Sequence, residues 1–123
     1  MANHRIVHFE LPADQPEELV QFYRQLFGWQ IQQAPIPGFE YWMCKTGDGP
    51  GIDGAITKRL LPQQAIINYV NVDQIEPSVE KARALGGKVI VPKTAVPGVG
   101  WFCVALDPEG NPLGFWQDDK SAK

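Results

Sequence analysis

The sequence DPEGNPLGFWQ, at residues 107–117, determines how the last part of this chain must fold. Its first six residues combine Pro, which fixes φ, with Gly and Asn, which tolerate the backbone conformations of tight turns. Apolar runs rich in aromatic and branched residues flank the turn at positions 101–106 and 113–116. The pattern therefore predicts two antiparallel strands joined by a turn, with Gly114 in the middle of the final strand.

Position 114 is the first candidate for a ligand contact. A side chain there would point toward whatever cavity the sheet encloses, and Gly114 contributes only a hydrogen atom. Trp116 shares this face, because side chains alternate along a strand with a period of two. A missing side chain beside a large ring predicts a slot that fits a planar or apolar ligand.

The composition is that of one globular domain. The 123 residues are 44% apolar and 20% charged, and a chain of this length can bury one hydrophobic core. The formal net charge of -3 argues against binding to the phosphate backbone of nucleic acids. The first residues lack the apolar run of an export signal, and no window is apolar enough to span a membrane. We therefore expect a cytoplasmic protein with no nucleic-acid or membrane partner, in which Cys44 and Cys103 are buried thiols.

The first half of the chain begins with a strand and a helix. Residues 6–11 alternate between apolar and polar side chains, which predicts a strand whose polar face carries His8 and Glu10. An apolar stripe with helical spacing follows within residues 19–27, and Gly28 should end that helix as a left-handed cap. Three further strands are expected at residues 29–33, 39–45 and 54–58.

The second half repeats this order. Residues 66–72 should form a strand, and the stripe Val79, Ala82 and Leu85 predicts a helix that a Gly-Gly pair closes. A strand at residues 88–92 and the hairpin described above complete the second set of three strands.

Matching features of the two halves lie at a nearly fixed offset. Asp14 with Glu17 and Asp73 with Glu76 both have the spacing of a capping box, and the two Asp residues are 59 positions apart. Internal similarity at a constant offset indicates duplicated architecture, so we predict a single domain built from two βαβββ units. The two units should span about residues 1–62 and 63–123.

Two copies of strand, helix and three strands in 123 residues resemble the vicinal oxygen chelate superfamily, which includes glyoxalase I, bleomycin-resistance proteins and extradiol dioxygenases. The resemblance covers nearly the whole chain. Its marks are HFELPAD at residues 8–14, FYRQLFGW at 22–29, VD at 72–73, LGG at 85–87 and DPEGN at 107–111. It implies an α+β fold in which a curved mixed sheet surrounds a concave cavity and the helices cover its outer face.

The resemblance also implies where a metal would be held. In metal-dependent members, four ligands come from the first and last strand of each unit. The matching positions are His8, Ile67, Gly114 and Gly54, with Ala55 or Thr57 as alternatives to Gly54. Ile and Gly have no donor atom in the side chain, whereas a transition metal needs about three such ligands. We therefore predict no family-type metal centre and no cofactor.

The candidate site residues share the face of the sheet that carries His8. The candidate ligand-binding residues are His8, Glu10, Tyr69, Asn71, Trp101, Gly114 and Trp116. His8 and Glu10 are also the candidate catalytic acid and base. A carboxylate beside an imidazole favours the charged pair, whereas burial raises the pKa of the carboxyl group, and the sequence leaves this balance open. His8 can equally be satisfied by a neighbouring strand, and most of the aromatic residues can pack in the core.

The sequence thus predicts a metal-independent protein that binds a small apolar or aromatic molecule, similar to bleomycin-resistance proteins. The alternative is a lyase, isomerase or dioxygenase related to glyoxalase I that uses His8 and Glu10. A third class is an interaction module whose cavity is filled by its own aromatic side chains. The resemblance to small single-chain members also implies a homodimer.

Overall fold

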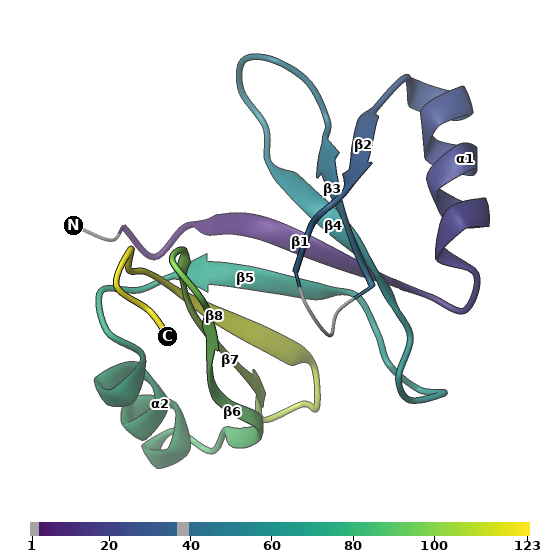
Figure 1. Cartoon of the computed structure of the whole chain (residues 1–123). Coiled ribbons are helices and arrows are strands. Elements are labelled where there is room, and N and C mark those ends of the chain that lie inside the picture. The colour runs from purple at the N-terminus through teal and green to yellow at the C-terminus, as the bar shows by residue number, and fades with distance from the viewer. Residues whose placement is uncertain (1–2, 37–39) are drawn as a thin grey trace. The chain divides into compact units, whose positions relative to one another are not determined.

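The structure, a computed structural model, describes residues 3–36 and 40–123 and divides into two compact units. Residues 8–66 make up the first unit, and residues 67–123 together with the segment up to Val7 make up the second. Each unit follows the predicted order of strand, helix and three strands (Figure 1). No helix among the described residues is long and apolar enough to cross a membrane.

The first unit contributes one helix and four neighbouring strands, which pair in both parallel and antiparallel fashion. Its elements are β1 (Ile6–Ala13, of which the first two residues belong to the second unit), α1 (Pro16–Phe27), β2 (Gln30–Gln33), β3 (Tyr41–Lys45) and β4 (Asp53–Lys58). The strands lie in the order β2-β3-β4-β1, with β4 parallel to β1 and antiparallel to β3. Position 39, where the third strand was expected to begin, lies outside the described residues. α1 packs on one face of this sheet, where Val20 joins Trp42, Cys44 and Ile56 in a buried cluster.

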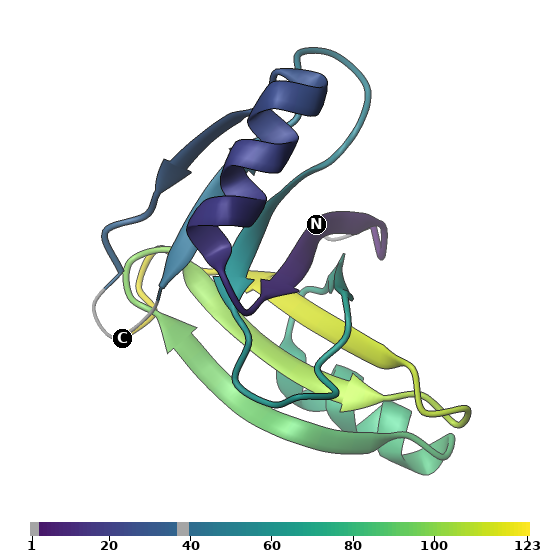
Figure 2. The same ribbon diagram turned by 90° about the vertical axis from the view of Figure 1, so that its right-hand side faces the viewer.

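The second unit has the same architecture. Its elements are β5 (Ile67–Asn71), α2 (Ile75–Ala84), β6 (Lys88–Val96), β7 (Gly100–Leu106) and β8 (Pro112–Asp118). The strands lie in the order β5-β8-β7-β6, with β5 parallel to β8 and the other neighbours antiparallel. α2 lies on one face of these strands (Figure 2), where Ile75 and Val79 pack with Cys103, Ala105 and Phe115. The predicted α+β fold of two βαβββ units with mixed sheets is confirmed.

The turn before β8 forms as predicted and is held by one carboxylate. Oδ1 of Asp107 accepts hydrogen bonds from the backbone N–H groups of Glu109, at 2.9 Å, and Asn111, at 2.8 Å. Its Oδ2 accepts from Nδ2 of Asn111 at 3.0 Å. The hydrogen bonds from Asn111 are the main reason that the pKa of Asp107 lies below its usual range. Gly110 has a φ of 84°, a conformation that favours glycine.

The predicted capping box at the first helix is wrong. α1 begins at Pro16, a residue that suits the first turn because it has no N–H to satisfy. The residue before it, Gln15, occupies the N-cap position and makes no side-chain cap bond. Asp14 therefore lies one residue too early to cap, and its Oδ1 accepts instead from Nε of Arg59 at 3.0 Å. The end of the helix is as predicted, since Gly28 adopts a φ of 73° and donates its N–H to the carbonyl of Arg24.

The second capping box is also wrong, because α2 begins one residue later than its spacing requires. Gln74 is the N-cap residue and makes no side-chain cap bond. The N–H of the buried Ile75 is donated to Oε1 of Gln117, on β8, at 3.0 Å. Glu76, the expected second member of the box, pairs with Nζ of Lys93. A side chain from the sheet thus replaces the local cap.

The predicted apolar stripes of the helices are only partly buried. On α1, Phe22, Leu26 and Phe27 are 55%, 56% and 60% exposed, and the buried residues are Pro16 and Val20. Several of the aromatic rings near the end of α1 stack on one another, as Tyr23 does on Trp29 at 4.8 Å between centroids, and Trp29 also contacts Phe9 of β1. On α2, Val79 is buried, but Leu85 lies at the C-cap and is 71% exposed.

Replacing Gln117 with Leu should lower the free energy of unfolding by about 1–3 kcal/mol, because the buried N–H of Ile75 would lose its acceptor. Gln117→Glu is the matched control. It keeps an acceptor oxygen and places a negative charge near a helix N-terminus, where such a charge is favourable. Urea unfolding followed by circular dichroism compares the two variants. Equal stability of the Leu and Glu variants would contradict the capping role of Gln117.

Candidate functional site

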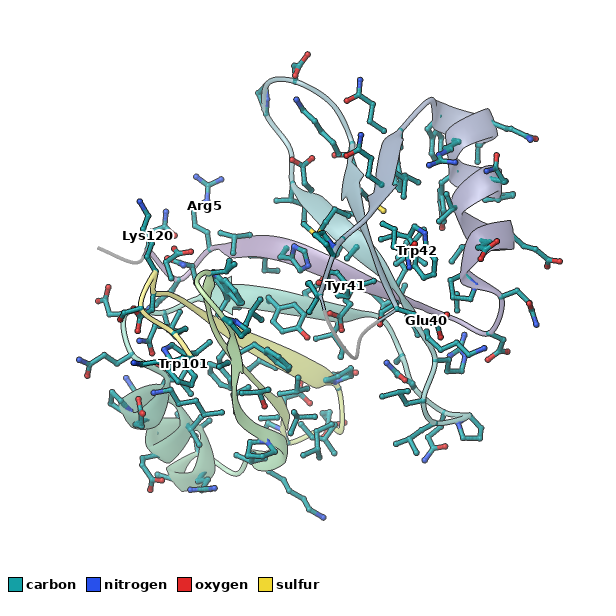
Figure 3. All side chains as sticks on the ribbon, viewed as in Figure 1. Arg5, Glu40, Tyr41, Trp42, Trp101 and Lys120 are labelled. Atoms are coloured by element: carbon teal, nitrogen blue, oxygen red, sulfur yellow. The ribbon has the colours of Figure 1, made fainter. Side chains whose placement is uncertain are left out.

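Strand β3 separates its side chains onto two faces of the first unit's sheet. Trp42 and Cys44 are buried in the cluster with α1, so Tyr41 is directed to the opposite side of the strand (Figure 3). Phe9 also packs against the α1 cluster, and its neighbours His8 and Glu10 therefore lie on the same side as Tyr41. We call this side the helix-free face of the first unit.

His8, Tyr41 and Glu10 form one hydrogen-bonded group on the helix-free face. Nε2 of His8 lies 2.8 Å from the phenol oxygen of Tyr41, and the two rings are within 12° of parallel. The Tyr41 phenol is also hydrogen-bonded to the side chain of Glu10. When Glu10 is ionised its carboxylate can only accept, so the phenol then donates to Glu10 and the Nε2–H tautomer of His8 donates to the phenol oxygen. We call this group the His8–Tyr41–Glu10 triad.

Burial controls the protonation of the triad. It lowers the pKa of His8 below the usual 6.5, and the nearby Asp53 carboxylate opposes this shift. Burial, followed by the charge and the hydrogen bond of Glu10, raises the pKa of Tyr41 far above the usual 10.0. At neutral pH the triad therefore contains a neutral imidazole and a protonated phenol. Such a pair can exchange hydrogen bonds or a proton with a bound molecule.

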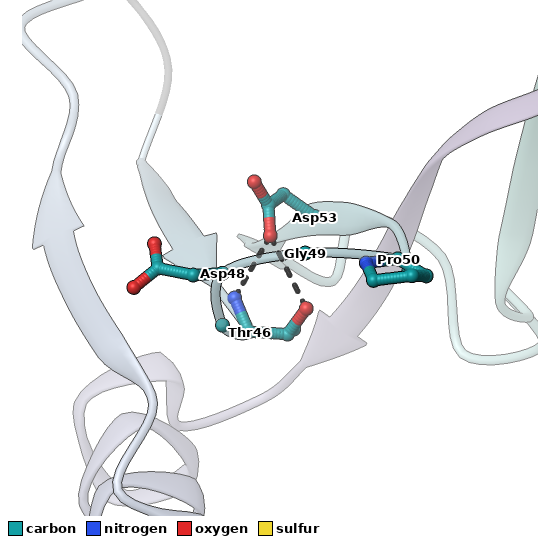
Figure 4. Close-up of a pocket in the computed structure, with 7 residues that line it drawn as sticks. Thr46, Asp48, Gly49, Pro50 and Asp53 are labelled. Atoms are coloured by element: carbon teal, nitrogen blue, oxygen red, sulfur yellow. Dashed lines mark hydrogen bonds between the residues drawn. The ribbon is translucent and has the colours of Figure 1, made fainter.

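A glycine-rich loop holds Asp53 beside His8. Asp53 is the parallel-strand partner of His8, and its Oδ1 accepts from the N–H and the hydroxyl of Thr46, at 2.9 and 3.2 Å (Figure 4). The loop lines a cavity of about 140 Å³ with Thr46, Asp48, Asp53, three glycines and a proline. That volume is below the range of about 300–1,000 Å³ typical of small-molecule pockets. The loop fixes the position of the Asp53 carboxylate, whose charge opposes the lowering of the His8 pKa by burial.

A larger cavity of about 340 Å³ lies on the other side of the sheet. Its lining residues are Leu11, Pro12, Leu19, Tyr23, Arg59, Gln64, Ala65 and Ile66. Leu11, Leu19 and Tyr23 pack against the α1 cluster, and none of the predicted site residues lines this cavity. The Arg59 guanidinium is bound to Asp14 and to the carbonyls of Pro12 and Gln64, so it serves to fix the loop.

The second unit carries an aromatic cluster on the face away from α2. Its members are Tyr69, Phe102 and Trp116, packed with Ile67, Val91 and Val104. Tyr69 is paired with Gly114, and a Cβ atom at Gly114 would overlap the Tyr69 ring. A Cβ atom at Gly100 would likewise overlap the ring of Trp116. The expected open slot at Gly114 is therefore wrong, because the protein's own Tyr69 fills it.

Two further candidates are tied to one carboxylate. Nε1 of Trp116 donates to Oδ1 of Asp118 at 2.8 Å, and Nδ2 of Asn71 donates to Oδ2 at 3.3 Å. Asn71 is also the strand partner of Trp116, so the two side chains share one face with Tyr69. The structure thus brings Asn71, Tyr69, Gly114 and Trp116 together.

Trp101 does not join that group. It packs against the buried cluster of α2, on the opposite face of β7 from Phe102. Its Nε1 donates to Oδ2 of Asp119 at 2.9 Å, and Nζ of Lys93 lies 4.3 Å from its ring centroid. These contacts assign Trp101 a structural role at the base of α2.

Strand register identifies which positions of the two units correspond. In the first unit, Phe9 is opposite Gly54, and a Cβ atom at Gly54 would lie 2.5 Å from the Phe9 ring, on the α1 face. Glu10 is opposite Ala55, just as Tyr69 is opposite Gly114 in the second unit. The counterpart of Gly114 is therefore Ala55, and the choice of Gly54 is wrong by one residue.

The four positions matched to metal ligands are thus His8, Ala55, Ile67 and Gly114. Of these, His8 alone has a side-chain donor atom. A shift of one residue along β5 would place Asn68 at this position, but Ile67 is the residue buried in the aromatic cluster. Within residues 3–36 and 40–123, no group of three or more His, Cys, Asp or Glu side chains is arranged to hold a metal ion.

Comparison with known proteins agrees with this architecture. A family model for the glyoxalase-like domain matches residues 7–115. The chain belongs to this family. This glyoxalase-like domain is 32% identical over 106 residues to a putative glyoxylase of Mycobacterium bovis, a match that covers 82% of the chain and 39% of that relative. It is 31% identical over 114 residues to a glyoxylase-like domain-containing protein of Didymella fabae, covering 87% of the chain and 88% of that protein. The chain thus spans about two-fifths of the length of the mycobacterial relative.

Solved structures share the fold of this glyoxalase-like domain. A glyoxalase/bleomycin resistance protein/dioxygenase superfamily member from Vibrio splendidus has a TM-score of 0.65 at 18% identity, covering 94% of this chain and 100% of that chain. A methylmalonyl-CoA epimerase from Mycobacterium tuberculosis has a TM-score of 0.67 at 10% identity, covering 97% and 93%. These identities show the fold alone. The superfamily that the sequence pattern indicated is confirmed.

Sequence analysis did not single out Tyr41 as a member of the polar group. A signal existed, because Trp42 and Cys44 are the apolar pair that faces the helix, which directs Tyr41 to the side of His8. The contact itself depends on the register of β3, β4 and β1, which no local pattern specifies.

Replacing His8 with Gln should change the pH dependence of stability. The pKa of His8 in the folded protein lies below 6.5, so the unfolded chain binds a proton at His8 more readily. The free energy of unfolding therefore decreases as the pH falls below about 6.5. Above that pH His8 is neutral in both the folded and the unfolded chain, so its protonation does not lower the free energy of unfolding. Urea unfolding of wild type and His8→Gln at about pH 8 and about pH 5 should therefore show a smaller acid-induced loss in the variant.

The exposed His4 provides the matched control for this measurement. His4→Gln should retain the wild-type difference in stability between the two pH values. An identical acid-induced loss in wild type and His8→Gln would show that burial of His8 has no effect on its protonation.

Proposed function

We propose that this glyoxalase-like domain binds a small aromatic or apolar molecule that carries a hydrogen-bonding group, and that it does so without a metal ion. The His8–Tyr41–Glu10 triad carries the proposal. Its members are linked through the Tyr41 phenol and lie on the face that α1 leaves uncovered. A few convergent polar groups beside aromatic surface are typical of sites that orient small ligands.

The aromatic rings determine the ligand class. The ring of Tyr41 lies 6.4 Å from that of His8, so the triad presents planar surface as well as hydrogen-bonding groups. Tyr69, Asn71 and Trp116 remain candidate ligand contacts on the second unit. Gly114 contributes by admitting the Tyr69 ring, and Trp101 is no longer proposed because it packs against α2.

The single donor among the four matched positions supports binding without a metal. Zn, Ni, Mn or Fe needs about three side-chain ligands, and Ala55, Ile67 and Gly114 supply none. Elemental analysis of the purified protein should therefore find far less than one transition-metal ion per chain. One equivalent of bound metal, removed together with ligand binding by a chelator, would refute this part.

Ligand binding can be tested with a panel of simple phenols and aromatic carboxylates, using ligand-detected NMR and thermal shift. Tyr41→Phe and His8→Ala should each weaken binding of the best probe by about 10- to 100-fold, since a buried hydrogen-bonding group would lose its partner. Trp101→Phe is the control, because Trp101 lies against α2. Unchanged affinity in both triad variants would contradict the proposed site.

The second candidate is an enzyme, a lyase or isomerase that uses His8 and Glu10 as its acid and base. One observation favours it: burial keeps the imidazole in its neutral, proton-accepting form beside a protonated phenol. A dioxygenase is less well supported because it requires a metal. In this case His8→Ala would abolish turnover of a probe even at concentrations that saturate its binding to the variant.

We also propose a homodimer in the cytoplasm. The exposed Phe22, Leu26 and Phe27 on α1 supply apolar surface that a second copy can cover. Light scattering at micromolar concentration should then give about twice the chain mass of 13.7 kDa, and a strict monomer would contradict this. The free, buried thiols of Cys44 and Cys103 favour a reducing compartment, which cell fractionation would check.

A further inference from the structure

Ala55 occupies the centre of the candidate site. On β4 it is paired with Glu10 of β1 on one side and with Met43 of β3 on the other. Paired residues of neighbouring strands share a face, so Ala55 lies on the helix-free face with Glu10. Its side chain is nevertheless 0% exposed, so other atoms cover it completely.

The register places His8 and Tyr41 on opposite sides of Ala55. His8 is level with Asp53, two residues before Ala55, and Tyr41 is level with Thr57, two residues after it. The two rings approach from opposite sides of β4 and meet at 2.8 Å between Nε2 and the phenol oxygen. The line that joins them therefore crosses β4 at Ala55.

The Tyr41 side chain therefore has little space above the sheet where it crosses β4. Neighbouring strands are about 4.8 Å apart, so β3 and β1 are separated by roughly 10 Å, and Tyr41 must lie along the sheet to reach across. A side chain larger than a methyl group at position 55 would stand in its path. The corresponding position of the second unit follows the same rule, since Gly114 lies under the ring of Tyr69 with no room for even a Cβ atom.

We propose that Ala55 is a positioning residue of this site, whose methyl group lets the Tyr41 phenol cross β4 and connect His8 with Glu10. The consequence for ligands rests on the proposed function, because the triad is the group that would bind them. A small residue at position 55 gives a connected triad. A large residue gives a separate imidazole and carboxylate, with the phenol displaced.

The first test uses the ligand-free protein. In wild type, nitrogen-detected NMR should find His8 as the Nε2–H tautomer with a slowly exchanging Nε2 proton. In Ala55→Leu that proton should exchange much faster, and the ionisation of Tyr41 should move down in pH because the phenol loses its bond to Glu10. Ala55→Ser and Ala55→Gly should retain the wild-type signals.

Two controls separate positioning from general overpacking. Ala13→Leu enlarges another buried alanine of the first unit, on the α1 side, and should cost stability without changing the His8 signals. In a Tyr41→Phe background, Ala55→Leu should have no further effect on His8, as a double-mutant cycle requires. If Ala55→Leu does not fold, Ala55→Val replaces it, with the same direction of change expected.

The inference is overturned if a folded Leu or Val variant keeps the slowly exchanging Nε2 proton and the wild-type ionisation of Tyr41. Its failure is distinct from failure of the proposed function. Loss of the His8 signals together with an unchanged affinity for the aromatic probes would support the role of Ala55 and refute ligand binding by the triad. Loss of both, by about 10-fold or more in affinity, would support the two proposals together.

Discussion

Each helix buries one face of its own sheet, and this one-sided burial is the constraint on which the rest of the structure depends. Along β3 it draws Trp42 and Cys44 toward α1 and leaves Tyr41 on the opposite face. Along β7 it does the same, with Cys103 and Ala105 against α2 and Phe102 and Val104 facing away. Because side chains alternate strictly along a strand, one apolar contact with a helix determines the direction of every neighbour.

The chemistry of the triad follows from a balance between burial and hydrogen bonding. A histidine and a glutamate two residues apart on one strand can form an ion pair if water solvates them, and burial opposes that outcome. Here the Tyr41 phenol is bonded to both side chains, burial keeps the imidazole neutral, and the carboxylate accepts a bond from an uncharged donor. The nearby Asp53, held by Thr46, partly offsets the effect of burial on His8.

Both units place a small residue beneath a larger side chain, but the side chains above it differ in chemistry. Gly114 and Gly100 admit the rings of Tyr69 and Trp116, and the second unit thereby fills its own helix-free face with aromatic side chains. Ala55, the counterpart of Gly114, instead lies beneath a group that retains polar atoms. This difference directs the search for a ligand site to the first unit.

The amino-acid sequence by itself determined the order of the elements, the turn at Asp107, the left-handed cap at Gly28 and the doubled unit, because these depend on local backbone chemistry and on periodicity. It also placed His8 and Glu10 on one face. The helix starts, the exposure of Phe22 and the occupant of the space at Gly114 were decided by tertiary structure. So was the bridge through Tyr41, because strands distant in sequence meet in a register that only the packed sheet specifies.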